Sequence, residues 1–206
     1  VDRALQQVTS TKDALNGDAK LAEAKAAARQ NLGTLNHITN AQRTALEGQI
    51  NQATTVDGVN TVKTNANTLD GAMNSLQGAI NDKDATLRNQ NYLDADESKR
   101  NAYTQAVTAA EGILNKQTGS NSDKAAVDRA LQQVTSTKDA LNGDAKLAEA
   151  KAAAKQNLGT LNHITNAQRT DLEGQINQAT TVDGVNTVKT NANTLDGAMN
   201  SLQGSI

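Results

Sequence analysis

Three acidic side chains, Asp94, Asp96 and Glu97, are spaced closely enough to suggest a shared cation. An EF-hand loop that began at Asp94 would need glycine at its sixth position, where this chain has Lys99. Aspartate is also preferred at the N-terminus of a helix, where its carboxylate accepts backbone N–H groups. We therefore interpret Asp94 as the cap of a helix in which Glu97 takes the reciprocal position, and we predict no metal site.

No other group of residues has the spacing of a catalytic or cofactor site. The two histidines, His37 and His163, occupy equivalent positions of an internal repeat, so we interpret them as turn residues and not as a shared general base. The chain has no cysteine, and no serine or threonine has a recognisable base and orienting acid. No glycines have a phosphate-binding spacing. The sequence predicts a protein that is not an enzyme, with no cofactor and no small-molecule substrate.

The only aromatic residues are Tyr92 and Tyr103. Tyr103 falls on an apolar helical stripe and is expected in the core. Tyr92 falls in an expected loop, 89–93, where it would either cover the end of a helix bundle or contact a ligand; we favour the cover.

The composition excludes several kinds of partner. The net charge is −2, from 20 basic and 22 acidic side chains without long runs of either sign, which argues against binding to nucleic acid or to an anionic membrane. The core must be aliphatic, since tryptophan and phenylalanine are absent. No apolar run is long enough for a transmembrane helix, so any targeting signal is expected outside this segment.

The chain repeats itself. Val1–Ile80 recurs as Val127–Ile206, and the two copies differ only at Arg29/Lys155, Ala45/Asp171 and Ala79/Ser205. This pattern indicates a slice of a tandem array. Near-identity is suited to a spacer whose length is the useful property, and equally to a binder that gains avidity from many weak sites.

One stretch should position the other elements. Apolar residues at alternating spacings of three and four run from Val59 to Ile80, and a step of seven then leads to Leu87. Only Lys83 interrupts this stripe, and the chain contains no proline. We predict one unbroken helix of roughly 35 residues, about 50 Å long, shared by two bundles.

Further helices are predicted at 1–16, 19–35, from Thr39 onward, 95–114 and 124–141. Thr39 and Gln42 have the spacing of a capping box. Gly17 is expected to end the first helix in a left-handed conformation, with Asp18 capping the second. Residues 118–122 are expected to form a loop.

Each repeat period then supplies two three-helix bundles. A chain that enters a three-helix bundle at one end leaves it at the other, so tandem copies are expected to line up. The predicted fold is all-α, with tandem three-helix bundles joined by shared long helices into an elongated rod, a spectrin-like arrangement.

Several stretches resemble two known module families. Residues 21–25 (LAEAK), 50–59 (INQATTVDGV) and the apolar helix after them resemble the GA module, a three-helix unit of bacterial albumin-binding surface proteins. Residues 92–96 (YLDAD), 99–103 (KRNAY) and 106–107 (AV) resemble the FIVAR module. The resemblance implies the last helix of a truncated FIVAR-like bundle at 1–17, a GA-like bundle at 18–80, a FIVAR-like bundle at 81–143 and a second GA-like bundle at 144–206.

Alternating FIVAR and GA modules at this period are similar to giant cell-wall proteins of staphylococci. The resemblance implies a non-enzymatic structural and adhesive segment of a bacterial cell-surface rod, monomeric within a longer array. It also implies attachment to fibronectin or another extracellular matrix protein, and a role in cell-envelope integrity.

An alternative is a dedicated binding module for a host plasma protein, with albumin as the partner that the GA resemblance suggests. Albumin-binding GA modules carry tyrosine and lysine around the start of their second helix, and the missing aromatic anchor here argues against albumin. Any ligand would contact an exposed face, and the tentative contact residues are His37, Asn40, Gln42, Arg43 and Tyr92. An intracellular scaffold is a third possibility, consistent with the absence of cysteine.

Overall fold

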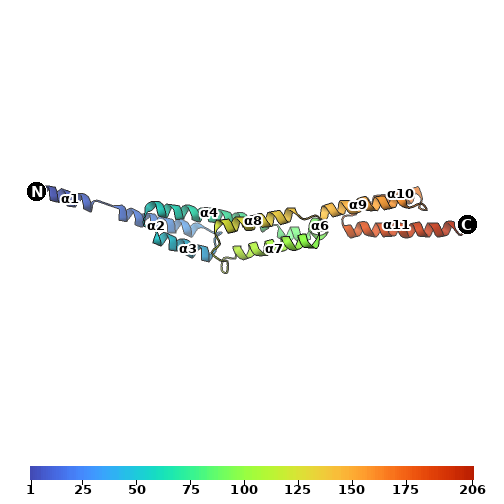
Figure 1. Cartoon of the computed structure of the whole chain (residues 1–206), viewed down its shortest axis with the longest axis horizontal. Helices are drawn as coiled ribbons and strands as arrows, with labels where there is room; N and C mark the ends of the chain where they lie inside the picture. The colour runs from blue at the N-terminus through green and yellow to red at the C-terminus, as the bar shows by residue number, and fades with distance from the viewer. The chain divides into compact units, whose positions relative to one another are not determined.

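The computed structural model describes residues 1–206, and it contains helices but no strands (Figure 1). The helices are α1 (Asp2–Asp13), α2 (Gly17–Thr34), α3 (Asn40–Gln52), α4 (Val56–Ile80), α5 (Lys83–Arg88), α6 (Gln90–Leu93), α7 (Glu97–Leu114), α8 (Lys124–Asp139), α9 (Gly143–Thr160), α10 (Asn166–Gln178) and α11 (Val182–Gln203). The all-α prediction is confirmed. None of these helices combines the length and apolar character needed to cross a lipid bilayer.

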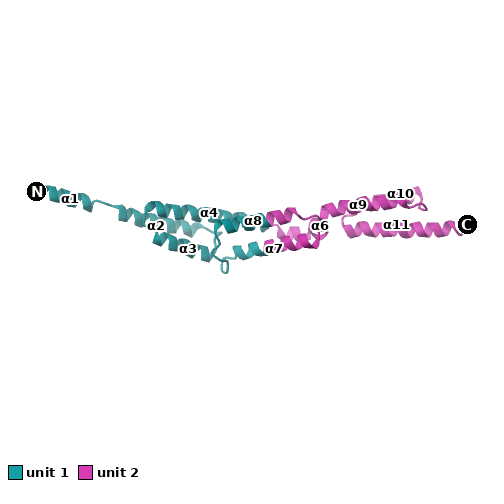
Figure 2. Ribbon diagram, in the orientation of Figure 1, with its two compact units in different colours: residues 1–80, 108–133 teal, residues 81–107, 134–206 magenta.

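The chain divides into two compact units, coloured separately in Figure 2. The first consists of residues 1–80 and 108–133. Within it, α2, α3 and α4 pack on one another as a three-helix bundle. Leu32, Ile50, Met73 and Leu76 are almost completely buried in its core. These residues lie on the apolar stripes that the sequence pattern predicts.

The second unit consists of residues 81–107 and 134–206. Here α9, α10 and α11 form a three-helix bundle, and α6 packs against α9. Its core contains Ala154, Leu158, Ile176 and Val185. The small side chain of Ala154 is 1% exposed, in keeping with a close approach of helices.

The predicted unbroken helix from Val59 to Leu87 is wrong at one place. The helix α4 ends at Ile80, residues 81–82 form a turn, and α5 begins at Lys83. The turn residues are Asn81 and Asp82, whose short polar side chains compete with the helix for backbone hydrogen bonds. The two helices that contribute residues to both units are instead α7 and α8.

Two local predictions also need correction. The expected loop at 89–93 contains the single helical turn α6, with the Asn89 side chain accepting the N–H of Asn91 at its start. Gly17 does not adopt a left-handed conformation, since no glycine has a positive φ. It is instead the first residue of α2, and Asp18 lies in the first turn of that helix, where its charge suits the helix dipole.

Candidate binding surface at the helix turns

His37 lies in the turn between α2 and α3, and Asp70 of α4 holds that turn in place. The backbone N–H of His37 donates to Asp70 Oδ1 at 2.7 Å, and His37 Nδ1 lies 2.9 Å from Asp70 Oδ2. The N–H of Ile38 donates to the same carboxylate at 3.3 Å. One carboxylate thus satisfies two backbone donors that the turn leaves without helical partners. His37 is a turn residue, with 39% of its side chain exposed.

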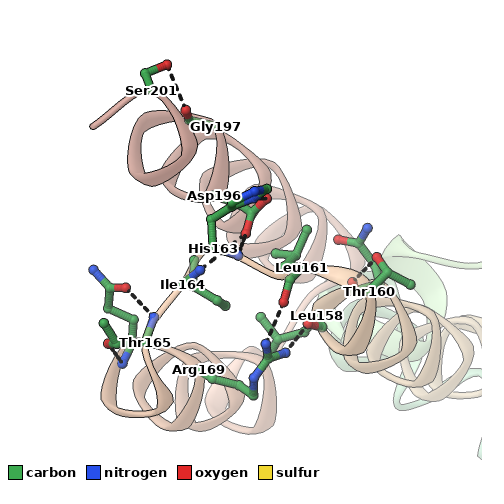
Figure 3. Close-up of polar contacts among 12 residues, drawn as sticks. Leu158, Thr160, Leu161, His163, Ile164, Thr165, Arg169, Asp196, Gly197 and Ser201 are labelled. Carbon is green, nitrogen blue, oxygen red and sulfur yellow. Dashed lines mark hydrogen bonds and ion pairs between the residues drawn. The ribbon is translucent and has the colours of Figure 1, made fainter. Parts of the chain in front are cut away.

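The second copy repeats this arrangement in the turn between α9 and α10 (Figure 3). Asp196 of α11 accepts the N–H of His163 at 2.7 Å and the N–H of Ile164 at 3.3 Å, and it lies 3.0 Å from His163 Nδ1. The hydrogen bond from the His163 side chain, helped by the backbone N–H, holds the pKa of Asp196 below its usual value of 3.8. The charged carboxylate is therefore the form that the folded turn favours.

We expect acid to weaken the second turn through Asp196. Because its pKa is lowered on folding, ionised Asp196 stabilises the protein above its usual pKa, and this contribution is lost as the pH falls through the folded-state value. Asp196→Asn should lower the urea midpoint at about pH 6, and its deficit relative to wild type should shrink by about pH 2.5. Urea unfolding followed by circular dichroism measures both midpoints, and a deficit that is constant with pH would contradict this role.

Arg43 secures the other side of the turn. Its guanidinium donates to the carbonyl of Leu32 and, at 2.6 Å, to the carbonyl of Leu35, both at the C-terminus of α2. Arg169 does the same for the equivalent carbonyls in the second copy (Figure 3). A cation at a helix C-terminus also interacts favourably with the helix dipole. The guanidinium of Arg43 thus stabilises the turn through hydrogen bonds to these two carbonyls.

Gln42 forms the predicted capping box with Thr39. The N–H of Thr39 donates to Gln42 Oε1 at 2.8 Å, and the N–H of Gln42 donates to Thr39 Oγ1 at 3.2 Å. Gln42 Nε2 also donates to the carbonyl of Ser122 at 2.8 Å. The side chain of Gln42 is fully buried. Its expected role as an exposed ligand contact is therefore wrong, because the loop before α8 covers it.

The same loop contacts Asn40, whose backbone N–H donates to the carbonyl of Lys116 at 2.9 Å. Asn40 as a whole remains exposed. Of the tentative contact residues around this turn, Asn40 and part of His37 are thus the ones whose side chains reach solvent most freely.

We expect Gln42→Ala to destabilise the protein more than Gln168→Ala, the matched change in the second copy. Gln42→Ala leaves the Ser122 carbonyl and the Thr39 N–H without their partner in a buried place, which costs about 1–3 kcal/mol. Gln168 caps α10 in the same way but is only half-buried, so water can replace it and the cost should be about 0.5–1 kcal/mol. Urea denaturation of both variants measures the difference, and equal losses would contradict it.

Tyr92 packs edge-on against the buried Tyr103, with ring centroids 6.2 Å apart and an interplanar angle of 65°. Tyr103 is 0% exposed, which confirms its predicted place in the core. Tyr92 is half-buried and lines a groove of about 510 Å³ together with Asp82, Lys138 and Asp144. It therefore covers the core and still presents a surface to solvent.

The groove beside Tyr92 has an ion pair in its wall. Lys138 Nζ donates to Asp82 Oδ2 at 2.5 Å, and this hydrogen bond raises the pKa of Lys138 above its usual 10.5. Both side chains are more than a third exposed, so the pair is screened by solvent and contributes little to stability. The groove thus offers an aromatic edge beside charged and amide groups.

Asp94 does not cap α7, contrary to the sequence prediction. Its carboxylate accepts Gln90 Nε2 at 2.9 Å and the backbone N–H of Val182, the first residue of α11, at 2.9 Å. Asp94 therefore caps the start of α11, which lies 88 residues along the chain. The helix α7 begins at Glu97, so Asp94 is too far from its first turn.

Asp96, the residue before α7, joins that helix to the start of α9. Its carboxylate accepts Asn142 Nδ2 at 2.8 Å and Lys146 Nζ at 3.0 Å, and its backbone N–H donates to Asn142 Oδ1 at 3.0 Å. The hydrogen bond from Asn142 and that from Lys146 hold the pKa of Asp96 below its usual value. No group of three or more His, Cys, Asp or Glu side chains is arranged to hold a metal ion.

Comparison with protein-family models identifies two module types. The GA module model matches residues 18–72 and 144–198, and the FIVAR domain model matches residues 72–142. The matrix-binding protein EbhA of Staphylococcus aureus strain Mu3 is 77% identical over the whole of this chain, which spans only 3% of that protein's length.

Solved structures of related staphylococcal proteins are also similar to this chain. The crystal structure of the 756–1003 domain of EbhA from Staphylococcus aureus is 78% identical, with a TM-score of 0.90 over 94% of this chain and 78% of that one. A structure from a study of Staphylococcus epidermidis adherence to fibronectin, mediated by the extracellular matrix binding protein Embp, is 30% identical. It has a TM-score of 0.57 and covers 60% of this chain and 98% of that one. The relatives are extracellular matrix-binding proteins and not enzymes, which confirms the prediction that the chain is not an enzyme.

Proposed function

Because the chain belongs to the staphylococcal Ebh family of extracellular matrix-binding proteins, we propose that it is a structural and adhesive repeat segment that attaches a bacterial surface to fibronectin. The observation that carries the adhesive part is the likeness to the Embp repeat, whose parent protein mediates adherence to fibronectin. Repetition within the chain supports it, since weak sites gain apparent affinity when many are linked.

The proposed location is the bacterial cell wall, and the proposed structural role is that of a spacer. In this proposal the modules meet at residues 17/18, 80/81 and 143/144. A chain that enters a three-helix bundle at one end leaves it at the opposite end, so successive modules would follow one another. Such an array would also contribute to the integrity of the cell envelope. In this proposal length is useful in itself, and the ligand contacts are repeated along it.

The ligand contacts are proposed at the exposed parts of the turn and of the groove. Asn40, the exposed part of His37 and the outer edge of Tyr92 are accessible on separate units. Arg43 and Gln42 are left out of the proposed contact surface. The Arg43 guanidinium donates to backbone carbonyls, and Gln42 is buried. An albumin-type site would need a large aromatic anchor at the turn, and the residues there are polar.

Titration calorimetry with soluble fibronectin at physiological salt tests the adhesive part. We expect saturable binding with a dissociation constant of about 1 µM or tighter, weakened by Tyr92→Ser or by Asn40→Ala combined with Asn166→Ala. Gln52→Ala, at an exposed position at the end of α3, is the control that should bind normally. Serum albumin should give no heat under the same conditions.

Absence of fibronectin binding up to about 1 mM, where the binding free energy is only about −4 kcal/mol, would overturn the adhesive part of the proposal. Binding to albumin alone would favour the plasma-protein alternative. In either case the spacer role would need its own test, because it does not depend on a ligand.

A further inference from the structure

The chain contains two Asn-Gly steps, Asn16-Gly17 and Asn142-Gly143, at equivalent positions of the repeat. The sequence around them is the same, since residues 1–28 and 127–154 are identical. Their backbones also agree, because Asn16 has φ −124° and ψ 20° and Asn142 has φ −124° and ψ 19°. Any difference in their chemical reactivity must therefore come from their surroundings.

An asparagine that precedes glycine is prone to deamidation, because glycine has no side chain to hinder its own backbone nitrogen. The side chain and the following peptide turn toward one another, and the glycine nitrogen, after losing its proton to hydroxide, attacks the asparagine Cγ. A bond forms between this nitrogen and Cγ, the bond from Cγ to Nδ2 breaks, and ammonia leaves with a proton. Water then opens the cyclic imide at either carbonyl, which leaves aspartate or isoaspartate.

The first step, Asn16-Gly17, has the freedom that this reaction needs. Asn16 is exposed, and its side chain makes no capping hydrogen bond at the start of α2. Gly17 is exposed as well, and a Cβ atom built on it would have nothing within 4 Å. The side chain and the following peptide can therefore turn toward one another in contact with water.

At the second step, Asp96 holds both ends of the amide group. Asn142 Nδ2 donates to Asp96 Oδ2 at 2.8 Å, and Asn142 Oδ1 accepts the backbone N–H of Asp96 at 3.0 Å. Lys146 Nζ donates to the other carboxylate oxygen of Asp96 at 3.0 Å, which keeps that carboxylate in place. A rotation that brings Cγ to the Gly143 nitrogen would break both bonds of the amide.

The glycine of the second step is also enclosed. Gly143 is buried, and a Cβ atom built on it would lie 2.5 Å from the carbonyl oxygens of Gln90 and Asn91. The peptide after Gly143 is fixed by two hydrogen bonds: Gln90 Nε2 donates to the Gly143 carbonyl at 3.0 Å, and the Asp144 N–H donates to Asn91 Oδ1 at 3.0 Å. Gly143 therefore has little room to turn and little contact with water.

We propose that Asn142-Gly143 is a latent deamidation site, which Asp96 and α6 keep unreactive and which is modified only when their contact with the start of α9 opens. The proposal does not depend on fibronectin binding, because it rests on the comparison of two identical steps. Deamidation replaces Nδ2, a donor to Asp96, with a carboxylate oxygen, and two negative charges at this distance repel. The modification therefore opposes reclosure, so that each opening can leave a permanent chemical change.

Peptide mass spectrometry of the whole chain, incubated at mildly alkaline pH, tests the protection. Cleavage after glutamate places Asn16 in residues 1–23 and Asn142 in residues 112–149, and fragment ions locate the deamidated asparagine. We expect Asn142 to deamidate at least about tenfold more slowly than Asn16, because only the small open population reacts. Equal rates in the folded chain would overturn the proposal.

Concentrated urea supplies the unfolded reference, in which the two rates should become equal because the local sequences are identical. A difference that persists in urea would overturn the proposal, since folding would then not be its cause.

Asp96→Ala removes the acceptor of Asn142 Nδ2 and should accelerate deamidation of Asn142 by about fivefold or more. Asp196→Ala is the matched control, because it removes a carboxylate that holds a different turn of the same unit. It should leave the Asn142 rate unchanged. Equal acceleration by the two variants would overturn the role of Asp96, since unfolding of the whole unit would then control the reaction.

Asn142→Asp reproduces one product of the reaction and should lower the urea midpoint of unfolding, because it places a second carboxylate against Asp96. Asn16→Asp is the matched control and should cause no loss, since aspartate is favourable at an exposed N-cap. An unchanged midpoint in Asn142→Asp would contradict the claim that the modification opposes reclosure.

Discussion

Tyr103→Ala should cost the protein about 3–5 kcal/mol of unfolding free energy, the range for removing a large aromatic side chain from a core. Tyr103 is 0% exposed, and the half-buried ring of Tyr92 rests edge-on against it. The chain has no tryptophan or phenylalanine, so Tyr92 is the only other aromatic ring that borders the cavity. Urea denaturation at several protein concentrations measures the loss.

Tyr103→Phe is the matched control, and we expect it to be neutral or slightly stabilising. The Tyr103 hydroxyl is buried and has no hydrogen-bond partner, so removing it removes a desolvation cost. A loss above about 1 kcal/mol in the phenylalanine variant would mean that the hydroxyl has a partner in solution. A small loss in the alanine variant would mean that Tyr103 is not in a packed core.

Met73→Pro should disrupt α4 and lower the unfolding free energy by about 3 kcal/mol or more from the backbone alone. Proline removes one helical hydrogen bond and its ring clashes with the preceding turn. Met73 is also fully buried in the first unit, so the lost side-chain packing adds about 2 kcal/mol.

Met199→Pro makes the same change in the same local sequence, four residues before α11 ends at Gln203. Helix ends fray, and Met199 is only half-buried, so we expect a clearly smaller loss. Circular dichroism and urea denaturation compare the two variants. Equal losses would show that Met73 is no better packed in solution than Met199.

Local sequence signals predicted local structure well. The capping box of Thr39 and Gln42 was predicted from a spacing of three residues, and both of its hydrogen bonds are present. Tyr103 was placed in the core by its position on an apolar stripe. The break between α4 and α5 also has a local cause, the low helix propensity of Asn81 and Asp82. The prediction of an unbroken helix gave more weight to the apolar pattern on either side of these two residues.

Contacts between distant residues could not be predicted. The carboxylate of Asp94 caps a helix that begins at Val182, and a sequence gives no sign of a hydrogen bond across that separation. The burial of Gln42 likewise depends on a carbonyl at Ser122. Because the two copies differ at only three positions, none of which contributes to the hydrogen bonds of Gln42, the difference in exposure between Gln42 and Gln168 comes from the loop before α8, which covers only Gln42.

The central claim is that this segment spaces successive modules along a line, and small-angle X-ray scattering of the chain in dilute solution tests it most directly. Three successive bundles of about 30 Å each, together with the ends of the chain, predict a maximum dimension of about 100 Å. A single compact globule of this length would instead have a radius of gyration of about 17 Å and a maximum dimension near about 50 Å. The first result would support the spacer role, and the second would contradict it.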